Sequence, residues 1–258
     1  MARRRPQVYL AGAMTWLAAV AAPGAQQAVP APALPTVVLR EPWRQTAPEH
    51  GVSQENVSNP NLELRLYDPA ASLVPANLKN PPPGSRTGDW GGPTCIQIAG
   101  YDQSRPPAQV AQGAPSDPPN LWTGVCSTPV AATLRDRANY LDLRGLARIR
   151  WVTRVSGFHA VRPVLKLADG TWLVGDYADG QASTNSTLFL ESEFAVASVR
   201  WLALDISRVI TRGFWVEKPD LSRVDEIGFA DLLPGSGHGW GGFVNVGRIE
   251  VSGGTVRR

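Results

Sequence analysis

From Val130 to Val251 the sequence is a succession of short apolar or alternating segments, separated by turns rich in glycine, proline and aspartate. These segments recur at a spacing of roughly 8 to 12 residues, which is typical of antiparallel all-β domains. Helical periodicity is almost absent, and only residues 221–224, after a Pro-Asp pair, resemble a helical turn. The pattern predicts an all-β fold, a two-sheet antiparallel β-sandwich of jelly-roll type. It excludes parallel βαβ folds and helical bundles.

Several segments show the alternation expected of a strand with one buried face. In residues 147–155, Ile149, Trp151, Thr153 and Val155 share one face, and three arginines lie on the other. Residues 158–167 and 172–177 are expected to form a hairpin that turns at 168–170. The remaining strands are expected at residues 61–67, 130–134, 140–143, 188–196, 199–206, 226–229 and 244–251.

The N-terminus has the features of a secretory signal. Three arginines at positions 3–5 precede an apolar stretch from Val8 to Ala22, and small residues follow at the expected cleavage region. We therefore expect a signal peptide over residues 1–25, a flexible Pro/Ala-rich extension over 26–60, and a β-sandwich domain over 61–258. The mature protein is expected to be periplasmic or extracellular, with no membrane span after signal removal.

Charge adds little support for a nucleic-acid or anionic-membrane partner. The chain has 25 Lys+Arg and 22 Asp+Glu, a net charge of +3, and the three arginines of the predicted signal account for all of it. The mature chain is therefore close to neutral, and no nucleic acid is expected as a partner. Arg257 and Arg258 are interpreted as a solvated basic end.

Cys95 and Cys126 are the only cysteines of the chain. In an exported protein an even pair usually forms a disulfide, which here closes a loop of roughly 30 residues and contributes on the order of 3 kcal/mol. The three histidines, His50, His159 and His238, show no short-range spacing of metal ligands, so no metal and no cofactor are expected.

Three C-terminal segments, Trp201–Asp205, Asp220–Phe229 and Val246–Val251, resemble the last strands of galactose-binding-like jelly rolls. Many carbohydrate-binding modules have that architecture, and the resemblance covers about residues 130–253. It implies a noncatalytic protein that binds a carbohydrate or a cell-envelope glycan. No sugar-binding motif can be transferred residue by residue.

Two glycine-bearing loops, residues 175–180 and 235–242, are the expected binding edge. Sugar recognition needs flat aromatic faces beside groups that hydrogen-bond to hydroxyls. Tyr177 and Trp240 are expected to stack on a sugar ring, with Asp176 and His238 as hydrogen-bonding groups. Trp215 is a further candidate, whereas Trp151 and Trp201 are expected to be core residues.

Two other function classes stay open. A polysaccharide-processing hydrolase or lyase would use His159 with Glu191 or Glu193, because paired carboxylates carry out glycoside hydrolysis. Glu191 and Glu193 share one strand face, which is also typical of a solvated surface. The second alternative is a structural envelope protein that binds another protein. No serine nucleophile elbow, phosphate loop or dinucleotide motif is present.

Overall fold

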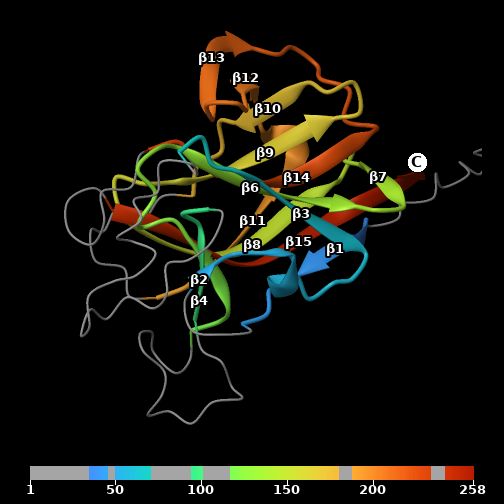
Figure 1. Ribbon diagram of the computed structural model, residues 1–258. Helices are drawn as coiled ribbons and strands as arrows, with labels where there is room; N and C mark the ends of the chain where they lie inside the picture. Colours follow the sequence, from blue (N-terminus) through green and yellow to red (C-terminus); the bar gives the residue numbers. More distant parts are fainter. Residues whose placement is uncertain (1–34, 46–49, 71–93, 101–116, 180–187, 234–241) are drawn as a thin grey trace, which may run out of the picture. The chain divides into compact units, whose positions relative to one another are not determined.

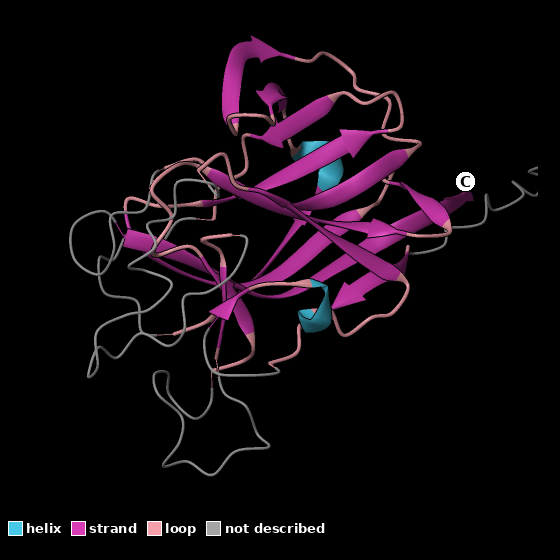
Figure 2. Cartoon of the chain, viewed as in Figure 1, coloured by secondary structure: helices cyan, strands magenta, loops and turns pink. Residues whose placement is uncertain are grey.

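The computed structural model describes residues 35–45, 50–70, 94–100, 117–179, 188–233 and 242–258. They belong to one unit that begins at Leu34. The predicted signal peptide lies outside the described residues. Strands dominate this part of the chain, and the helical elements within it are two short 3₁₀ turns, η1 (Gln54–Asn56) and η4 (Val196–Ser198) (Figure 2).

The all-β prediction is confirmed, and every strand pairing among the described residues is antiparallel. The strands are β1 (Thr36–Glu41), β2 (His50–Gly51), β3 (Leu62–Tyr67), β4 (Gln97–Ala99), β5 (Asn120–Trp122), β6 (Val130–Asp136), β7 (Asn139–Asp142), β8 (Arg148–Gly157), β9 (Val161–Leu167), β10 (Trp172–Gly175), β11 (Leu190–Ala195), β12 (Trp201–Asp205), β13 (Ile210–Trp215), β14 (Val224–Asp231) and β15 (Gly242–Arg257).

The first sheet is built around the N-terminal part of β15 (Figure 1). Strand β8 pairs with one edge of β15, and β11 pairs with β8. The opposite edge of β15 is shared by β5 and β1, and β4 and β2 follow beyond β5. As predicted, Ile149, Trp151, Thr153 and Val155 of β8 are all buried.

The second sheet has β14 near its centre, with β9, β10, β12 and β13 in succession on one side. On the other side β14 pairs with β6, which pairs with β3, and at its start with β7. The predicted hairpin is present: β9 and β10 are joined through a turn in which Gly170 has a φ of +89°. Strand β13 lies at the edge of this sheet and was not predicted.

A bend in β15 connects the two sheets. Residues 242–252 of this strand pair with β8, whereas residues 254–257 pair with β7 of the second sheet. A Cβ atom at Gly253 would lie 2.7 Å from the carbonyl oxygen of Asp142, so this close approach requires glycine. One continuous strand therefore belongs to both layers.

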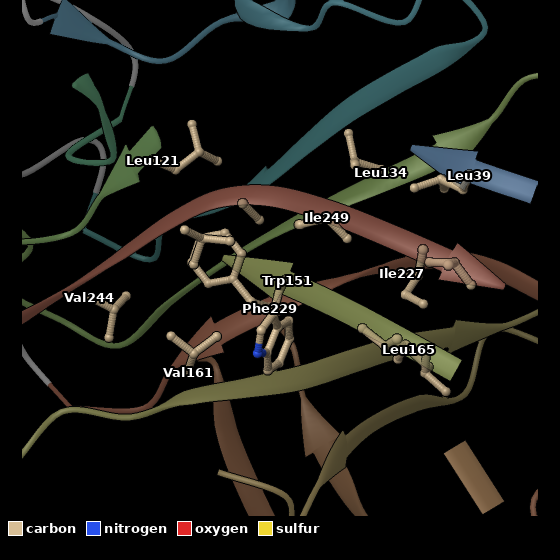
Figure 3. Close-up of a cluster of buried hydrophobic side chains, with 14 of the residues drawn as sticks. Leu39, Leu121, Leu134, Trp151, Val161, Leu165, Ile227, Phe229, Val244 and Ile249 are labelled. Carbon is tan, nitrogen blue, oxygen red and sulfur yellow. The ribbon is translucent and has the colours of Figure 1, made fainter. Parts of the chain in front are cut away.

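The hydrophobic core lies between the sheets (Figure 3). Trp151 and Ile249 come from the first sheet, and Leu165 and Phe229 come from the second, each no more than 1% exposed. Burial of side chains of this size contributes about 1.5 to 3 kcal/mol each. The prediction that Trp151 and Trp201 are core residues is confirmed by exposures of 0% and 3%.

A second apolar cluster covers part of the second sheet away from the main core. Its members include Val164 of β9, Val174 of β10 and Val209, which ends the turn between β12 and β13. Val209 has a φ of +53°, a left-handed conformation that is unusual for a β-branched residue. Its side chain is fully buried, and this packing offsets the backbone strain.

The predicted extension over residues 26–60 is corrected in its C-terminal part. Thr36–Glu41 forms β1, which pairs with β15, and Leu39 and Trp43 are buried. The fully buried Glu41 carboxylate accepts hydrogen bonds from the backbone N–H groups of Trp43, Ser58 and Asn59 at 2.7 to 3.0 Å. These bonds attach residues 57–59 to the end of β1, because a buried carboxylate must have its oxygens satisfied.

The predicted disulfide between Cys95 and Cys126 is confirmed, with a Cα–Cα distance of 5.0 Å. Cys95 precedes β4 and Cys126 follows β5, and these two strands pair with each other. The bond therefore links the two adjacent strands at the end opposite to their connecting segment, next to the buried Ile96 and Leu121. The loop-entropy contribution of such a bond is about 3 kcal/mol.

Leu39→Ala tests whether β1 is part of the folded domain. Leu39 is 2% exposed, so its truncation should lower the free energy of unfolding by about 2 to 5 kcal/mol. Val37 on the same strand is 56% exposed, and Val37→Ala should change stability by less than about 0.5 kcal/mol. Urea unfolding of both variants measures the difference, and equal stabilities would contradict this role of β1.

Candidate functional site

The five predicted binding residues fall into two groups. Asp176, Tyr177 and Trp215 lie in the described part of the chain, whereas His238 and Trp240 fall in residues 234–241, outside it. The expected meeting of the two glycine loops therefore stays a prediction. Asp176 and Trp215 are brought close to one another through a third residue, Arg200, which sequence reasoning did not identify.

Trp215 borders a surface pocket of about 270 Å³ at one end of β12 and β13, called here the Trp215 groove. Its walls come from η4, from the start of β12, and from residues 215–221. Trp215 is 38% exposed and is the last residue of β13. The other residues that line the groove are Val196, Ala197, Val199, Arg200, Trp201, Val216, Glu217, Lys218, Pro219 and Leu221.

Strand register places Arg200 beside Trp215. Trp215 pairs with Leu202 across the β12–β13 hairpin, and the backbone N–H of Val216 donates to the carbonyl oxygen of Trp201 at 2.8 Å. Arg200, two residues before Leu202, is then a diagonal neighbour of Trp215, within reach of a large side chain. Its guanidinium carbon lies 3.9 Å from the centre of the Trp215 ring, a cation–π contact.

Asp176 holds the backbone of Arg200 in place. Its carboxylate Oδ1 accepts a hydrogen bond from the Arg200 N–H at 2.8 Å, and its own N–H donates to the Arg200 carbonyl at 2.9 Å. Asp176 was expected to bind a ligand directly. The structure shows that one of its carboxylate oxygens positions the residue that stacks on Trp215, and direct ligand binding by Asp176 stays a prediction.

The floor of the Trp215 groove includes a buried donor without an acceptor. The indole N–H of Trp201 has no hydrogen-bond partner among the described residues, although Trp201 is only 3% exposed. A buried donor without a partner costs about 1 to 3 kcal/mol. Lys218, another lining residue, has a φ of +49°, which is uncommon for a residue other than glycine. Both features lie in the lining of the same pocket.

The Tyr177 ring, which was expected to stack on a sugar, already has a partner within the protein, and its sugar-binding role stays a prediction. Its ring is stacked on Phe194 at a centroid distance of 4.0 Å and packs against the core at Trp151. Burial, followed by the nearby Asp179 carboxylate, raises the pKa of the Tyr177 hydroxyl. One ring face is therefore occupied within the protein. The carboxylate of Asp179 accepts from Trp151 Nε1, Thr153 Oγ1 and Ser192 Oγ at 2.6 to 3.1 Å, so it joins this loop to the first sheet.

Glu191 and Glu193 form part of a solvated ion-pair array on the first sheet. Glu193 receives hydrogen bonds from Arg150 and Arg148 at 2.8 to 3.0 Å, and Glu191 is paired with Arg248. The hydrogen bond from Arg150, supported by Arg148, lowers the pKa of Glu193. A general acid needs a raised pKa, so this environment does not suit that role.

His159 does meet a carboxylate, but inside the protein. Its Nδ1 lies 2.7 Å from Oδ2 of Asp231, and the side chains of both residues are 1% exposed. Thr123 donates its hydroxyl to the same Asp231 oxygen at 2.8 Å and accepts from the N–H of Val244 at 3.1 Å. This network ties β14 to the start of β15. Its burial keeps it from the solvent-accessible position that a general base requires.

A second polar cluster lies on β14 beside the C-terminus. The buried Glu226 carboxylate accepts from Tyr67 Oη, Thr133 Oγ1 and Lys166 Nζ at 2.6 to 3.0 Å. Burial and the hydrogen bond to Glu226 raise the pKa of Tyr67. These groups satisfy one another, as a buried network must to be stable.

Arg258 is attached to this cluster, which corrects its interpretation as a solvated end. Its guanidinium donates to Asp225 and to the carbonyl oxygen of Asp136, and it lies 4.2 Å from the centre of the Tyr140 ring. Asp225 also accepts from Arg135 at 3.0 Å. Arg258 thus contributes a buried contact at the end of β15.

No protein family and no curated protein matches this chain. Among the described residues there is no group of three or more His, Cys, Asp or Glu side chains with the arrangement of a metal site. Within the same residues, no helix is both long and apolar enough to cross a membrane. The geometry of the Trp215 groove therefore carries the functional argument.

The hydrogen bonds that Asp225 accepts from Arg135, Arg258 and Lys166 lead us to expect that the stability of the fold depends on pH. Burial alone would raise the pKa of Asp225, but hydrogen bonds from Arg135, Arg258 and Lys166 outweigh it and lower the pKa below 3.8. A lowered pKa stabilises the fold at every pH above the unfolded value, and this contribution is lost as pH falls through the folded value. Asp225→Asn should lower neutral-pH stability by about 1 to 2 kcal/mol and flatten the loss of stability below about pH 4.

Urea unfolding of wild type and Asp225→Asn between about pH 7 and about pH 2.5 measures this effect. Asp169→Asn is the matched control, because Asp169 is an exposed turn carboxylate whose hydrogen bond to the N–H of Thr171 an asparagine can keep. The control should follow the wild-type profile. Parallel pH profiles for wild type and Asp225→Asn would contradict the role given to Asp225.

Proposed function

We propose that this protein is an exported, noncatalytic binder of carbohydrate or cell-envelope glycan, and that the Trp215 groove is its binding site. The observation that carries the proposal is the partly exposed Trp215 ring at the border of a pocket whose other walls present charged side chains. An aromatic face packs on the apolar side of a sugar ring, while neighbouring polar groups hydrogen-bond to its hydroxyls.

The polar groups of the groove differ in what they can offer a sugar. Arg200 offers up to five donors in a planar fork, Lys218 offers three donors, and Glu217 accepts. Donors and acceptors in one lining match the hydroxyls of a sugar, each of which both donates and accepts.

Export and family membership belong to the same proposal. The signal-like N-terminus supports transport out of the cytoplasm, and the Cys95–Cys126 disulfide and the described residues, which include no membrane-spanning helix, are compatible with it. We propose a periplasmic or extracellular location. The antiparallel two-sheet architecture is compatible with a galactose-binding-like jelly roll, and we propose that relationship on the sequence resemblance of residues 130–253.

The enzyme alternative is less well supported. Glu191 and Glu193 are engaged by arginines on an exposed face, and the His159–Asp231 pair is buried. These side chains are engaged in ion pairs or buried within the protein. Release of reducing ends from a polysaccharide by the purified protein would nevertheless favour the hydrolase or lyase over the binder.

The protein-binding alternative would use the edge strand β13. All six of its residues are exposed, including Ile210 and Phe214. However, its pairing with β12 is irregular between Leu202 and Leu204, and Gly213 has a φ of +79°. Such irregularities, together with an arginine at position 212, are the features that prevent edge strands from pairing with other chains.

A glycan-array screen of the purified protein with Trp215→Ala tests the proposed site. Loss of a stacking tryptophan should weaken glycan binding by at least tenfold, because aromatic contacts dominate such sites. Phe214→Ala is the matched control: Phe214 is the adjacent residue, is 55% exposed, and does not line the groove. It should bind like the wild type.

Trp240→Ala in the same screen distinguishes the Trp215 groove from the glycine loop. Binding that survives Trp215→Ala but is lost in Trp240→Ala would keep the ligand class and place the site in residues 235–242. An absence of binding to any glycan by the wild type would overturn the proposed function.

A further inference from the structure

We propose that the Trp215 groove selects acidic glycans, whose sugar rings carry carboxylate or sulfate groups. The inference rests on the proposed function and names the class of ligand. It comes from the charged side chains that line the groove beside Trp215.

The two cations that line the groove form no ion pair with a carboxylate among the described residues. Arg200 contacts the Trp215 ring, and neither Arg200 nor Lys218 forms an ion pair among the described residues. Arg212, exposed on the neighbouring β13, also has no ion pair within this part of the structure. Arg200 and Lys218 outnumber Glu217, the one acidic residue in the lining, while the exposed Asp176 carboxylate is bound to the Arg200 backbone N–H beside the groove.

Several arginines elsewhere in the described residues are neutralised by carboxylates, whereas Arg137, Arg162 and Arg223 have no ion pair there, so what distinguishes Arg200 and Lys218 is their place in the lining of one pocket. Arg148 and Arg150 are paired with Glu193, Arg135 is paired with Asp225, and Arg154 is paired with Asp117 at 2.8 Å. The protein as a whole is close to neutral once the N-terminal arginines are set aside. Unpaired cations at the groove therefore create a local positive potential that attracts an anionic ligand.

Arg200 is positioned to act as an anion receptor. Asp176 fixes its backbone through two hydrogen bonds, and the Trp215 ring supports its guanidinium at 3.9 Å. Neither contact uses the guanidinium N–H groups, which stay available. A planar fork of this kind donates two parallel hydrogen bonds to a carboxylate or a sulfate. A sugar on Trp215 could therefore direct its anionic substituent toward Arg200.

Lys218 supplies a second, independent observation. It is held at a φ of +49°, where glycine would be less strained, yet the position carries a cation that lines the groove. Strained backbone positions concentrate at binding sites. Lys218→Gly distinguishes a structural role of this residue from a ligand-binding role. The substitution relieves the backbone strain, so it should not destabilise the fold, but it removes the charge, so it should weaken binding of an anion.

Two matched pairs of polymers test the inference. Polygalacturonate is compared with its fully methyl-esterified form, and dextran sulfate with dextran, because each pair differs mainly in charge. We expect the purified protein to bind the acidic member of at least one pair more tightly, and to lose affinity as sodium chloride rises from about 0.05 to about 0.5 M. The pair that shows the preference identifies carboxylate or sulfate as the recognised anion.

Arg200→Gln and Lys218→Gly should each weaken binding to the acidic polymer about three- to tenfold more than they weaken binding to the uncharged member of the same pair, because only the acidic polymer loses a charge contact. Arg137→Gln is the control with the same charge change, since Arg137 is exposed and does not line the groove. Lys218→Gly should not lower the midpoint of thermal unfolding. If Lys218→Gly does lower this midpoint, the test of acidic-glycan selection relies on Arg200→Gln alone.

The outcomes separate the two proposals. Equal affinity for charged and uncharged members of both pairs overturns acidic selection and leaves glycan binding standing. A preference that persists in Arg200→Gln, or that falls equally in Arg137→Gln, also overturns it, because the groove would not be the source. No binding to any of the four polymers or to a glycan array overturns both proposals.

Discussion

The bend of β15 at Gly253 is the constraint on which the two layers depend. One strand pairs with β8 in the first sheet and then, after the bend, with β7 in the second. Because both sheets share this backbone, their inner faces are held opposite each other, and Trp151 can pack in one core with Phe229. A side chain at position 253 would collide with the carbonyl oxygen of Asp142, so the close approach of the two layers depends on glycine.

Buried hydrogen bonds and one disulfide add further links between segments that pack on this core. Glu41 binds three backbone N–H groups and attaches residues 57–59, the disulfide closes the β4–β5 ribbon, and Asp231 links His159 with Thr123. Each is a buried or cross-linked interaction between segments far apart in the sequence. Removing one partner would leave a buried polar group unsatisfied, which is why such contacts define a unique arrangement of loops.

Much of the fold could be predicted from periodicity. Apolar and polar residues alternate in β8 because one face of the strand is buried and the other is exposed to solvent, and this pattern indicated the observed strand. The glycine in the turn between β9 and β10 likewise indicated the observed hairpin. Strand β1 was missed because its short apolar run follows a Pro/Ala-rich stretch, and β13 was missed because Gly213 interrupts it. Both segments have only a weak local preference for the strand conformation, and they form strands because they pair with a strand elsewhere in the sheet.

The candidate site was only partly predictable. Trp215 was identified as an exposed aromatic candidate, and the charged Glu217–Lys218 turn that follows it was a signal that could have drawn attention. Tyr177 carried the same local signal as Trp215, yet it stacks on Phe194, because β11 lies beside its loop. Local composition does not distinguish an aromatic side chain that faces solvent from one that faces another strand.

The sequence by itself determined the all-β class, most strand positions and the disulfide, because these follow from side-chain alternation, turn residues and a single pair of cysteines. Only the tertiary structure decided which side chains meet. Arg200 stacks on Trp215 because β12 and β13 pair in one register, and Asp176 holds Arg200 because β10 is the other neighbour of β12. Strand register and strand order depend on contacts summed over the whole core, and no local segment encodes them.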